Sequence, residues 1–240
     1  MVQRKIVVEV PDDDSGNGSV TVVEPIALSG DVSNGGESTI QLDAPYRVSV
    51  TVTGSCEILF HRWQSDSVDA KAAAAKGSKA KKTDDVESYV WRNDENQICL
   101  PGEYLRGSLI DPRNGAAKYR QDPRSPRKSA LDLYRASIIS LTPLAPITKA
   151  SGEIAVEWDS LDRRRVTVQR QGVTRERPCF APGWSATVVF LCQSPNYIPP
   201  IALHQALNDA GRLVGVGDFR PSFGRFTVTN YELLSDDELV

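Results

Sequence analysis

The sequence predicts an α+β protein built on an antiparallel sheet, and three observations support that class. Valine alternates with polar residues within residues 46–60, which is the period-two pattern of a half-buried strand. Pro199-Pro200 opens an amphipathic helix over residues 201–213. A glycine-rich segment, residues 215–224, then joins that helix to a final β-rich stretch at residues 225–233.

The charge of the chain is unevenly distributed. Its 240 residues are 40% hydrophobic and 25% charged, as in ordinary globular domains, and the net charge of −3 provides no overall basic field. However, residues 106–128 hold seven basic side chains against two acidic ones, while acidic runs occupy residues 12–14 and 236–238. A basic middle between acidic ends favours a localised anionic partner.

The cysteine and histidine content argues against a metal centre or a cofactor. The only histidines are His61 and His204, so a zinc site has few ligands to draw on, and we predict neither metal nor cofactor. No signal peptide or membrane-spanning stretch is visible, so we expect a cytoplasmic protein without a membrane partner. Four cysteines without CxxC spacing are expected to be buried free thiols of a reducing cytosol: Cys56, Cys99, Cys179 and Cys192.

The first half of the chain is predicted to begin with strands. Valine-rich stretches at residues 5–10 and 19–28 flank a turn-forming run at residues 11–18. The clearest strand covers residues 46–60, with Gly54 marking a bulge or a close contact.

A lysine-rich insertion follows at residues 66–88. Residues 70–82 contain only Ala, Lys, Gly and Ser, with five lysines, and lack the apolar stripe of a packed helix. The segment is predicted to be a mobile projection or a solvated helix. It is either a flexible surface insertion or a basic arm that orders on nucleic acid or on a neighbouring subunit.

A hairpin at residues 88–91 and 97–100 leads to a proline-glycine turn and a helix at residues 102–110. Amides at the N-terminus of such a helix can receive a phosphate. Residues 111–130 are polar, basic and proline-containing, which predicts an irregular insertion. Order resumes as a strand at residues 137–141.

The second half repeats this pattern. Short strands are expected at residues 153–158 and 166–170, separated by a turn at residues 159–165 that carries three consecutive arginines. An apolar run at residues 185–192 predicts a central strand. The helix at residues 201–213 and the strand at residues 225–233 complete the order.

Without insertions, the order is βαββαβ, the ferredoxin-like arrangement on which RRM-like RNA-recognition modules are also built. We predict one such domain at residues 46–233, with basic insertions at residues 66–88 and 111–130. An N-terminal β segment (residues 1–45) precedes it, and an acidic tail (residues 234–240) follows it. The fold alone assigns no function.

The glycine-rich segment is the strongest functional signal. It combines three glycines with Arg220, and Arg225 follows directly. Glycine allows close backbone approach and positive φ, and fixed guanidinium groups can hold a phosphate backbone. The alternative is a tight loop whose arginines serve solubility.

Three segments in order resemble the RAMP superfamily, the ferredoxin-like proteins that form the crRNA-binding backbone of CRISPR effector complexes. They are residues 100–109 (LPGEYLRGSL), residues 175–178 (RERP) leading to Trp184, and residues 211–224. The resemblance covers residues 46–233. The chain departs from the family where Glu103 and Tyr104 replace the usual serine or threonine. A relative carried by a phage or mobile element of a prokaryotic host fits equally well.

The resemblance implies sequence-independent binding of single-stranded RNA or DNA, with subunits stacking into a helical filament in antiviral defence. Contacts to the strand would come from the first helix and the glycine-rich segment, and a reaching "thumb" from residues 76–82 or 113–128. The candidate nucleic-acid-binding residues are Arg106, Gly107, Ser108, Arg113, Lys118, Arg120, Arg220, Phe223, Gly224 and Arg225, with Lys79, Lys81 and Lys82.

Two alternatives remain at this stage. Some RAMP relatives cut RNA with a metal-dependent loop aspartate, and Asp66, Asp84 and Asp85 lie in a suitable segment, although each is otherwise a solvated carboxylate. No nucleophile constellation is visible, so a non-enzymatic binder is favoured. The other alternative is a viral structural or assembly protein on the same scaffold, whose N-terminal segment adds a strand to a neighbour.

Overall fold

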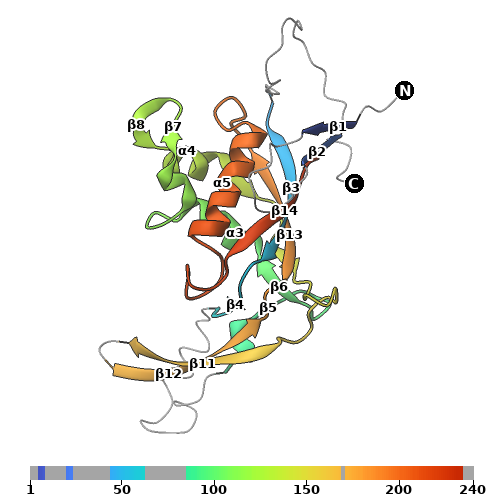
Figure 1. Ribbon diagram of the computed structural model, residues 1–240, viewed down its shortest axis with the longest axis vertical. Helices are drawn as coiled ribbons and strands as arrows, with labels where there is room; N and C mark the ends of the chain where they lie inside the picture. The colour runs from blue at the N-terminus through green and yellow to red at the C-terminus, as the bar shows by residue number, and fades with distance from the viewer. Residues whose placement is uncertain (1–4, 9–19, 24–43, 63–84, 169–170, 235–240) are drawn as a thin grey trace, which may run out of the picture.

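The computed structural model describes residues 5–8, 20–23, 44–62, 85–168 and 171–234. These residues form a mixed α+β structure with antiparallel sheets (Figure 1). The predicted lysine-rich insertion and the acidic tail lie almost entirely outside them. The described part contains three α-helices: α3 (Gly102–Ile110), α4 (Leu131–Ser137) and α5 (Pro200–Leu213).

The main sheet has six strands in the order β1-β2-β14-β3-β13-β9. Neighbouring strands are antiparallel except β2 and β14, which pair in parallel. The strands are β1 (Lys5–Val8), β2 (Val20–Val23), β3 (Tyr46–Gly54), β9 (Ile138–Ser140), β13 (Ser185–Cys192) and β14 (Phe226–Leu234).

The valine alternation of β3 determines which face of the sheet is buried. Val48, Val50 and Val52 are fully buried in the core that α3 and α5 complete on one face (Figure 1). The intervening residues point to the other face, where Thr51 Oγ1 lies 2.9 Å from Thr187 Oγ1 of β13. The sheet is therefore apolar beneath the helices and rich in hydroxyl groups on the opposite side.

Three smaller sheets surround this core, with strand orders β10-β6-β5, β11-β12-β4 and β7-β8. The long β11–β12 hairpin projects away from the helices (Figure 1). The strands are β4 (Ile58–Leu59), β5 (Trp91–Arg92), β6 (Ile98–Pro101), β7 (Gln121–Asp122), β8 (Ser125–Ser129), β10 (Leu144–Pro146), β11 (Ser160–Val168) and β12 (Gln171–Phe180). Two 3-10 turns, η1 (Glu87–Tyr89) and η2 (Ala116–Tyr119), complete the elements.

The predicted strand at residues 46–60 is divided in two, because β3 ends at Gly54 and β4 begins at Ile58. A Cβ on Gly54 would lie 2.0 Å from Trp184 Nε1, so the indole fills the space beside the bare backbone. The same Nε1 donates a hydrogen bond to the carbonyl of Cys56 at 2.9 Å. The close contact expected at this glycine is therefore present.

Three local predictions are wrong. Residues 153–158, predicted to be a strand, form only an isolated bridge between Ile154 and Thr148. The predicted turn at residues 159–165 is mostly strand β11, whose Arg164 pairs in register with Arg175. Its polar sequence hid the strand, which cross-strand ion pairs such as Arg163–Glu176 stabilise instead of an apolar face. The predicted irregular insertion at residues 111–130 contains η2 and the β7–β8 hairpin, because Ala116 and Ala117 are buried in the core.

Three buried tyrosines hold the start of α5 against the sheet and α4. Each hydroxyl donates to a carbonyl in or just before the first turn of the helix, where the chain enters after Pro199-Pro200. Burial raises the pKa of all three hydroxyls, that of Tyr134 to about 12. The bonds run from Tyr46 Oη to Ile198 O (2.9 Å), from Tyr231 Oη to Pro200 O (2.8 Å) and from Tyr134 Oη to Ala202 O (3.3 Å).

Replacing Tyr46 or Tyr231 by phenylalanine is expected to lower the free energy of unfolding by about 1–2 kcal/mol, since each change leaves a carbonyl without its donor. Urea denaturation measures this change. Tyr119→Phe is the control, because that side chain is 66% exposed and its hydroxyl is not needed for packing. Equal stability of all three variants would contradict the anchoring role.

Candidate nucleic-acid interface

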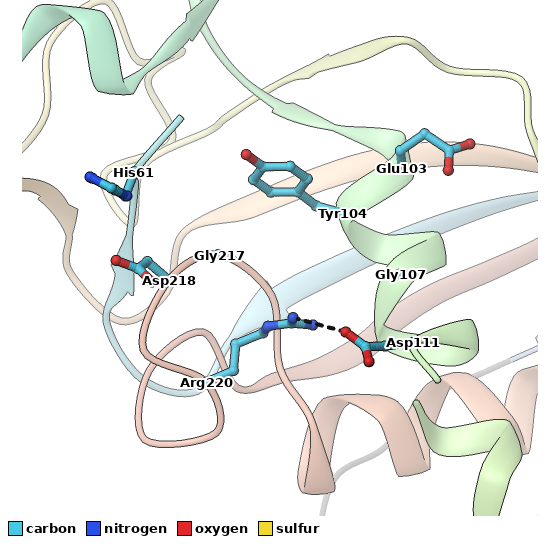
Figure 2. Close-up of a pocket in the computed structure, with 8 residues that line it drawn as sticks. All are labelled: His61, Glu103, Tyr104, Gly107, Asp111, Gly217, Asp218 and Arg220. Atoms are coloured by element: carbon cyan, nitrogen blue, oxygen red, sulfur yellow. Dashed lines mark hydrogen bonds and ion pairs between the residues drawn. The ribbon is translucent and has the colours of Figure 1, made fainter. Parts of the chain in front are cut away.

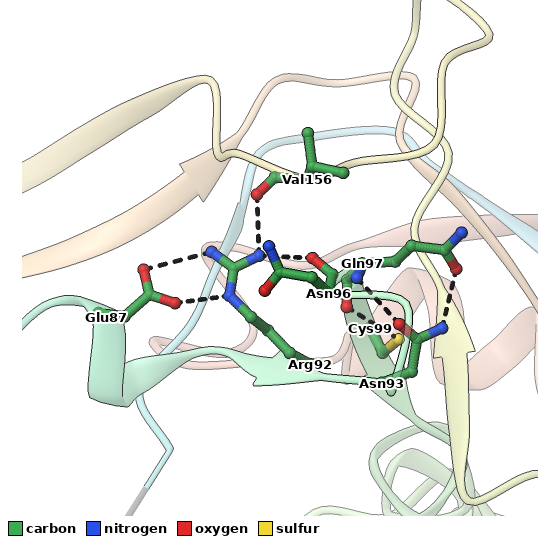
Figure 3. A network of polar contacts seen from close by, with 7 residues as sticks. All are labelled: Glu87, Arg92, Asn93, Asn96, Gln97, Cys99 and Val156. Atoms are coloured by element: carbon green, nitrogen blue, oxygen red, sulfur yellow. Dashed lines mark hydrogen bonds and ion pairs between the residues drawn. The ribbon is translucent and has the colours of Figure 1, made fainter.

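A polar cavity of about 240 Å³ lies between α3, the glycine-rich loop (residues 215–224) and His61, which lies two residues after the end of β4, as Figure 2 shows. The first-helix segment and the glycine-rich segment, about 100 residues apart in the sequence, therefore meet at one site. The lining residues are His61, Glu103, Tyr104, Gly107, Asp111, Gly217, Asp218 and Arg220.

The glycine-rich loop owes its shape to residues in the left-handed region. Gly215, Gly217 and Gly224 have φ of 76°, 80° and 73°, and Phe219 has φ of 57°. A Cβ on Gly224 would lie 1.7 Å from the carbonyl oxygen of Val216, so both the conformation and the space require glycine.

Backbone hydrogen bonds close this loop and join it to β4. Val216 N–H donates to Gly224 O at 2.8 Å, across the neck of the loop. Gly224 N–H donates to Glu57 O at 2.7 Å, and Asp218 N–H donates to Leu59 O at 2.9 Å. The side chains of the loop are thus presented to the cavity from a fixed backbone.

All three carboxylates of the cavity are paired with arginine. Burial works to raise the pKa of the Asp111 carboxyl, but the N–H of Arg113 and the guanidinium of Arg220 lower it below its usual value. Since each negative charge has its cation, the site is close to neutral. The pairs are Glu103–Arg106 (3.1 Å), Asp111–Arg220 (3.5 Å) and Asp218–Arg177 (2.5 Å).

The third predicted segment, residues 175–178, also reaches this site. It lies in β12, and its Arg177 is 6% exposed, with the Cζ atom 4.5 Å from the centroid of the Phe219 ring. From β11, the Cζ atom of Arg164 lies 4.5 Å from the centroid of the Phe223 ring. These cation–π contacts fasten the base of the hairpin to the glycine-rich loop.

The predicted residues of α3 play different parts. Gly107 lines the cavity, whereas the hydroxyl of Ser108 is buried and donates to Leu105 O at 2.6 Å. Arg106 donates from Nε to Ile138 O at 2.6 Å and from Nη2 to Arg135 O at 3.0 Å. The guanidinium of Arg106 therefore connects α3 to α4 and β9.

Four predicted basic residues remain in the described part of the chain. Arg113, Lys118 and Arg120 lie in or near η2, and Arg225 directly follows the glycine-rich loop. Lys118 Nζ donates to Arg113 O at 3.1 Å, and Arg120 pairs with Asp209 of α5 at 2.7 Å. Arg225 is exposed and donates from Nε to Pro221 O at 2.8 Å. These side chains do not line the cavity.

The other expectations concern residues that the structure covers only in part. Lys79, Lys81, Lys82, Asp66 and Asp84 lie outside the described residues. Asp85 is exposed, and its carbonyl accepts a hydrogen bond from Ser88 Oγ at 2.6 Å. Within the described ranges, no group of three or more His, Cys, Asp or Glu could hold a metal ion. No described helix is long and apolar enough to cross a membrane. All four cysteines are free thiols; three are buried and Cys56 is partly exposed.

Sequence comparison assigns no family, since no family model matches the chain and no curated protein matches it. Among solved structures, the chain is similar to a chain in the cryo-EM structure of the type III-B Cmr-beta bound to cognate target RNA. The TM-score is 0.41 at 11% identity, over 80% of this chain. The match spans 61% of the other chain, and it is too distant to assign a fold or a function.

Substituting Gly224 by alanine is expected to destabilise the protein by about 1–2 kcal/mol for the left-handed backbone and about 1–3 kcal/mol more for the clash. Gly152→Ala is the matched control, because Gly152 has φ of 89° but no atom lies within 4 Å of its Cβ position. Thermal and urea denaturation compare the two. Equal losses of stability in the two variants would show that the loop accommodates the added methyl group without the cost of a clash.

Proposed function

We propose that this protein binds single-stranded nucleic acid, RNA foremost, along the strand's backbone and as a repeating subunit built on a ferredoxin-like core. The meeting of α3 with the glycine-rich loop at one cavity, with Arg177 of β12 holding the loop through Asp218, carries the proposal. The strand order β14-β3-β13-β9, with the first and third strands of βαββαβ in the centre and both helices on one face, supports the core.

The β11–β12 hairpin supplies the basic surface that such a protein needs. Residues 160–180 contain six arginines against two acidic residues, and the side chain of Arg163 is 71% exposed. Guanidinium groups bind phosphate through paired donors. The hairpin therefore replaces residues 113–128 as the reaching arm, because that segment is tied to α5 through Arg120 and Asp209.

Gly107 supports close approach of a strand to α3. Glycine within a helix costs about 0.5–1 kcal/mol relative to alanine. A Cβ at Gly107 would meet no atom within 4 Å, so packing does not require the glycine. A ligand that occupies the space where a side chain at position 107 would lie would explain why this position is glycine.

The cavity is a better candidate than the open face of the main sheet. RNA-recognition modules stack bases on aromatic side chains of the sheet. The aromatic residues of β3 and β13, Tyr46 and Phe190, are buried on the opposite face, and the open face of these strands instead includes Thr51 and Thr187. The aromatic rings near the proposed interface are instead those of the loop and of α3.

Replacing Arg163 and Arg165 by alanine is expected to weaken binding to a labelled uridine oligonucleotide. If both arginines contact phosphates, the slope of log K against log salt falls in magnitude by about 1.4. Fluorescence anisotropy over a salt series measures it. Arg212→Ala is the matched control, since this arginine is 73% exposed on α5 and also paired with a carboxylate.

The repeating assembly is tested with the same material. Mass photometry on oligonucleotides of increasing length would count subunits per strand, which should rise in regular steps. An unchanged salt slope in the double variant would remove the hairpin from the interface, and a constant count of one would remove the repeating subunit.

Gly107→Gln is expected to raise the free energy of unfolding by about 0.5 kcal/mol, through helix propensity, while reducing nucleic-acid affinity about tenfold by filling the cavity. Urea denaturation and anisotropy provide the two readouts. Gly152→Ala, at an exposed turn, should leave affinity unchanged. Full affinity in Gly107→Gln would exclude this part of α3 from the interface.

A further inference from the structure

We propose that the cavity accepts one unpaired guanine base from the bound strand, which gives the protein a base-specific contact. The inference rests on the proposed function and adds to it, because backbone binding alone is indifferent to sequence. The cavity, at about 240 Å³, is smaller than the roughly 300–1,000 Å³ of pockets for drug-sized ligands. It therefore suits a single base.

The charges of the cavity favour a base over a phosphate. Glu103, Asp111 and Asp218 line it, and their charges are balanced by three arginines. A phosphate placed inside would approach carboxylate oxygens without an excess of positive charge. A neutral base has no such penalty, and an excess of arginines over acidic residues lies outside, on the β11–β12 hairpin.

The polar groups match guanine better than the other bases. The edge of guanine offers adjacent N1–H and N2–H donors, which one carboxylate can accept together, and its O6 and N7 accept from arginine. Asp111 and Arg220 lie in the cavity wall, joined only by a long contact of 3.5 Å (Figure 2). A guanine that separates them would satisfy both groups.

Aromatic residues complete the site. The rings of Tyr104 and His61 line the cavity, and the His61 ring is supported by Tyr89 at a centroid distance of 4.5 Å. Trp91 Nε1 donates to Tyr104 Oη at 3.3 Å, so the hydroxyl proton of Tyr104 remains to donate to a ligand. A base can stack on such rings.

Two buried donors, on residues that neighbour or contact this lining, have no hydrogen-bond partner among the described residues. They are Nη1 of Arg177, whose Nε holds Asp218, and Nε of Arg62, which follows His61 and whose Cζ lies 3.8 Å from the centroid of the Trp91 ring. An unsatisfied buried donor costs free energy. Acceptor atoms of a bound base, reached directly or through water, would offset that cost.

The test compares uridine oligonucleotides that carry one central guanosine, adenosine or cytidine. Anisotropy is expected to show about tenfold tighter binding of the guanosine strand. Asp111→Asn should bring the ratio of affinities close to one. Asp209→Asn should preserve it, because Asp209 is an arginine-paired carboxylate on α5, outside the cavity.

The outcomes separate this inference from the proposed function. Equal affinity for all strands would overturn the guanine site and leave backbone binding standing. If no strand binds, the proposed function fails, and calorimetry with free guanosine and adenosine then tests the cavity alone. Binding of guanosine only would support the site, whereas binding of neither or of both equally would overturn it.

Discussion

The ion pair between the buried Arg177 and the partly exposed Asp218 is the contact on which the rest of the site depends. It joins β12 to the glycine-rich loop at 2.5 Å, with the Phe219 ring packed against the guanidinium. Burying a charge is costly unless it is paired, so loss of Asp218 would leave the buried guanidinium of Arg177 without its counter-ion. Because the same loop bonds to β4 and faces α3, this pair fixes the wall that the loop contributes to the cavity.

The helix α5 leads into the loop, and the tyrosine contacts hold the start of that helix. The loop begins where α5 ends, with Gly215 N–H bonded to Ala210 O at 2.8 Å. Tyr46 and Tyr231 tie the opposite end of that helix to its neighbours. The loop is thus held by α5 at its start and by its contacts with β4 and β12. Such contacts can keep residues with left-handed backbone angles in one conformation.

Electrostatics divide the proposed interface into two parts with different tasks. The β11–β12 hairpin carries an excess of arginines over acidic residues, which suits phosphates, and the cavity pairs its charges and offers hydrogen-bonding groups that suit a base. Affinity in nucleic-acid binders comes chiefly from the first kind of contact and specificity from the second. Both parts are attached to the same loop, through Arg164 and Arg177.

The sequence by itself determined the elements whose signals are local: the valine alternation of β3, the proline-initiated α5 and the glycines of the loop. It did not reveal the first part of β11, whose stabilising partners lie on β12, or the helix α4. Only the tertiary structure decided which charges are paired. Arg106 donates to carbonyls of α4 and β9, and Arg177 donates to Asp218. These contacts join residues that lie about 30 to 40 positions apart in the sequence. A local pattern cannot report such pairings, because their free energy depends on burial and geometry that exist only after the chain has folded.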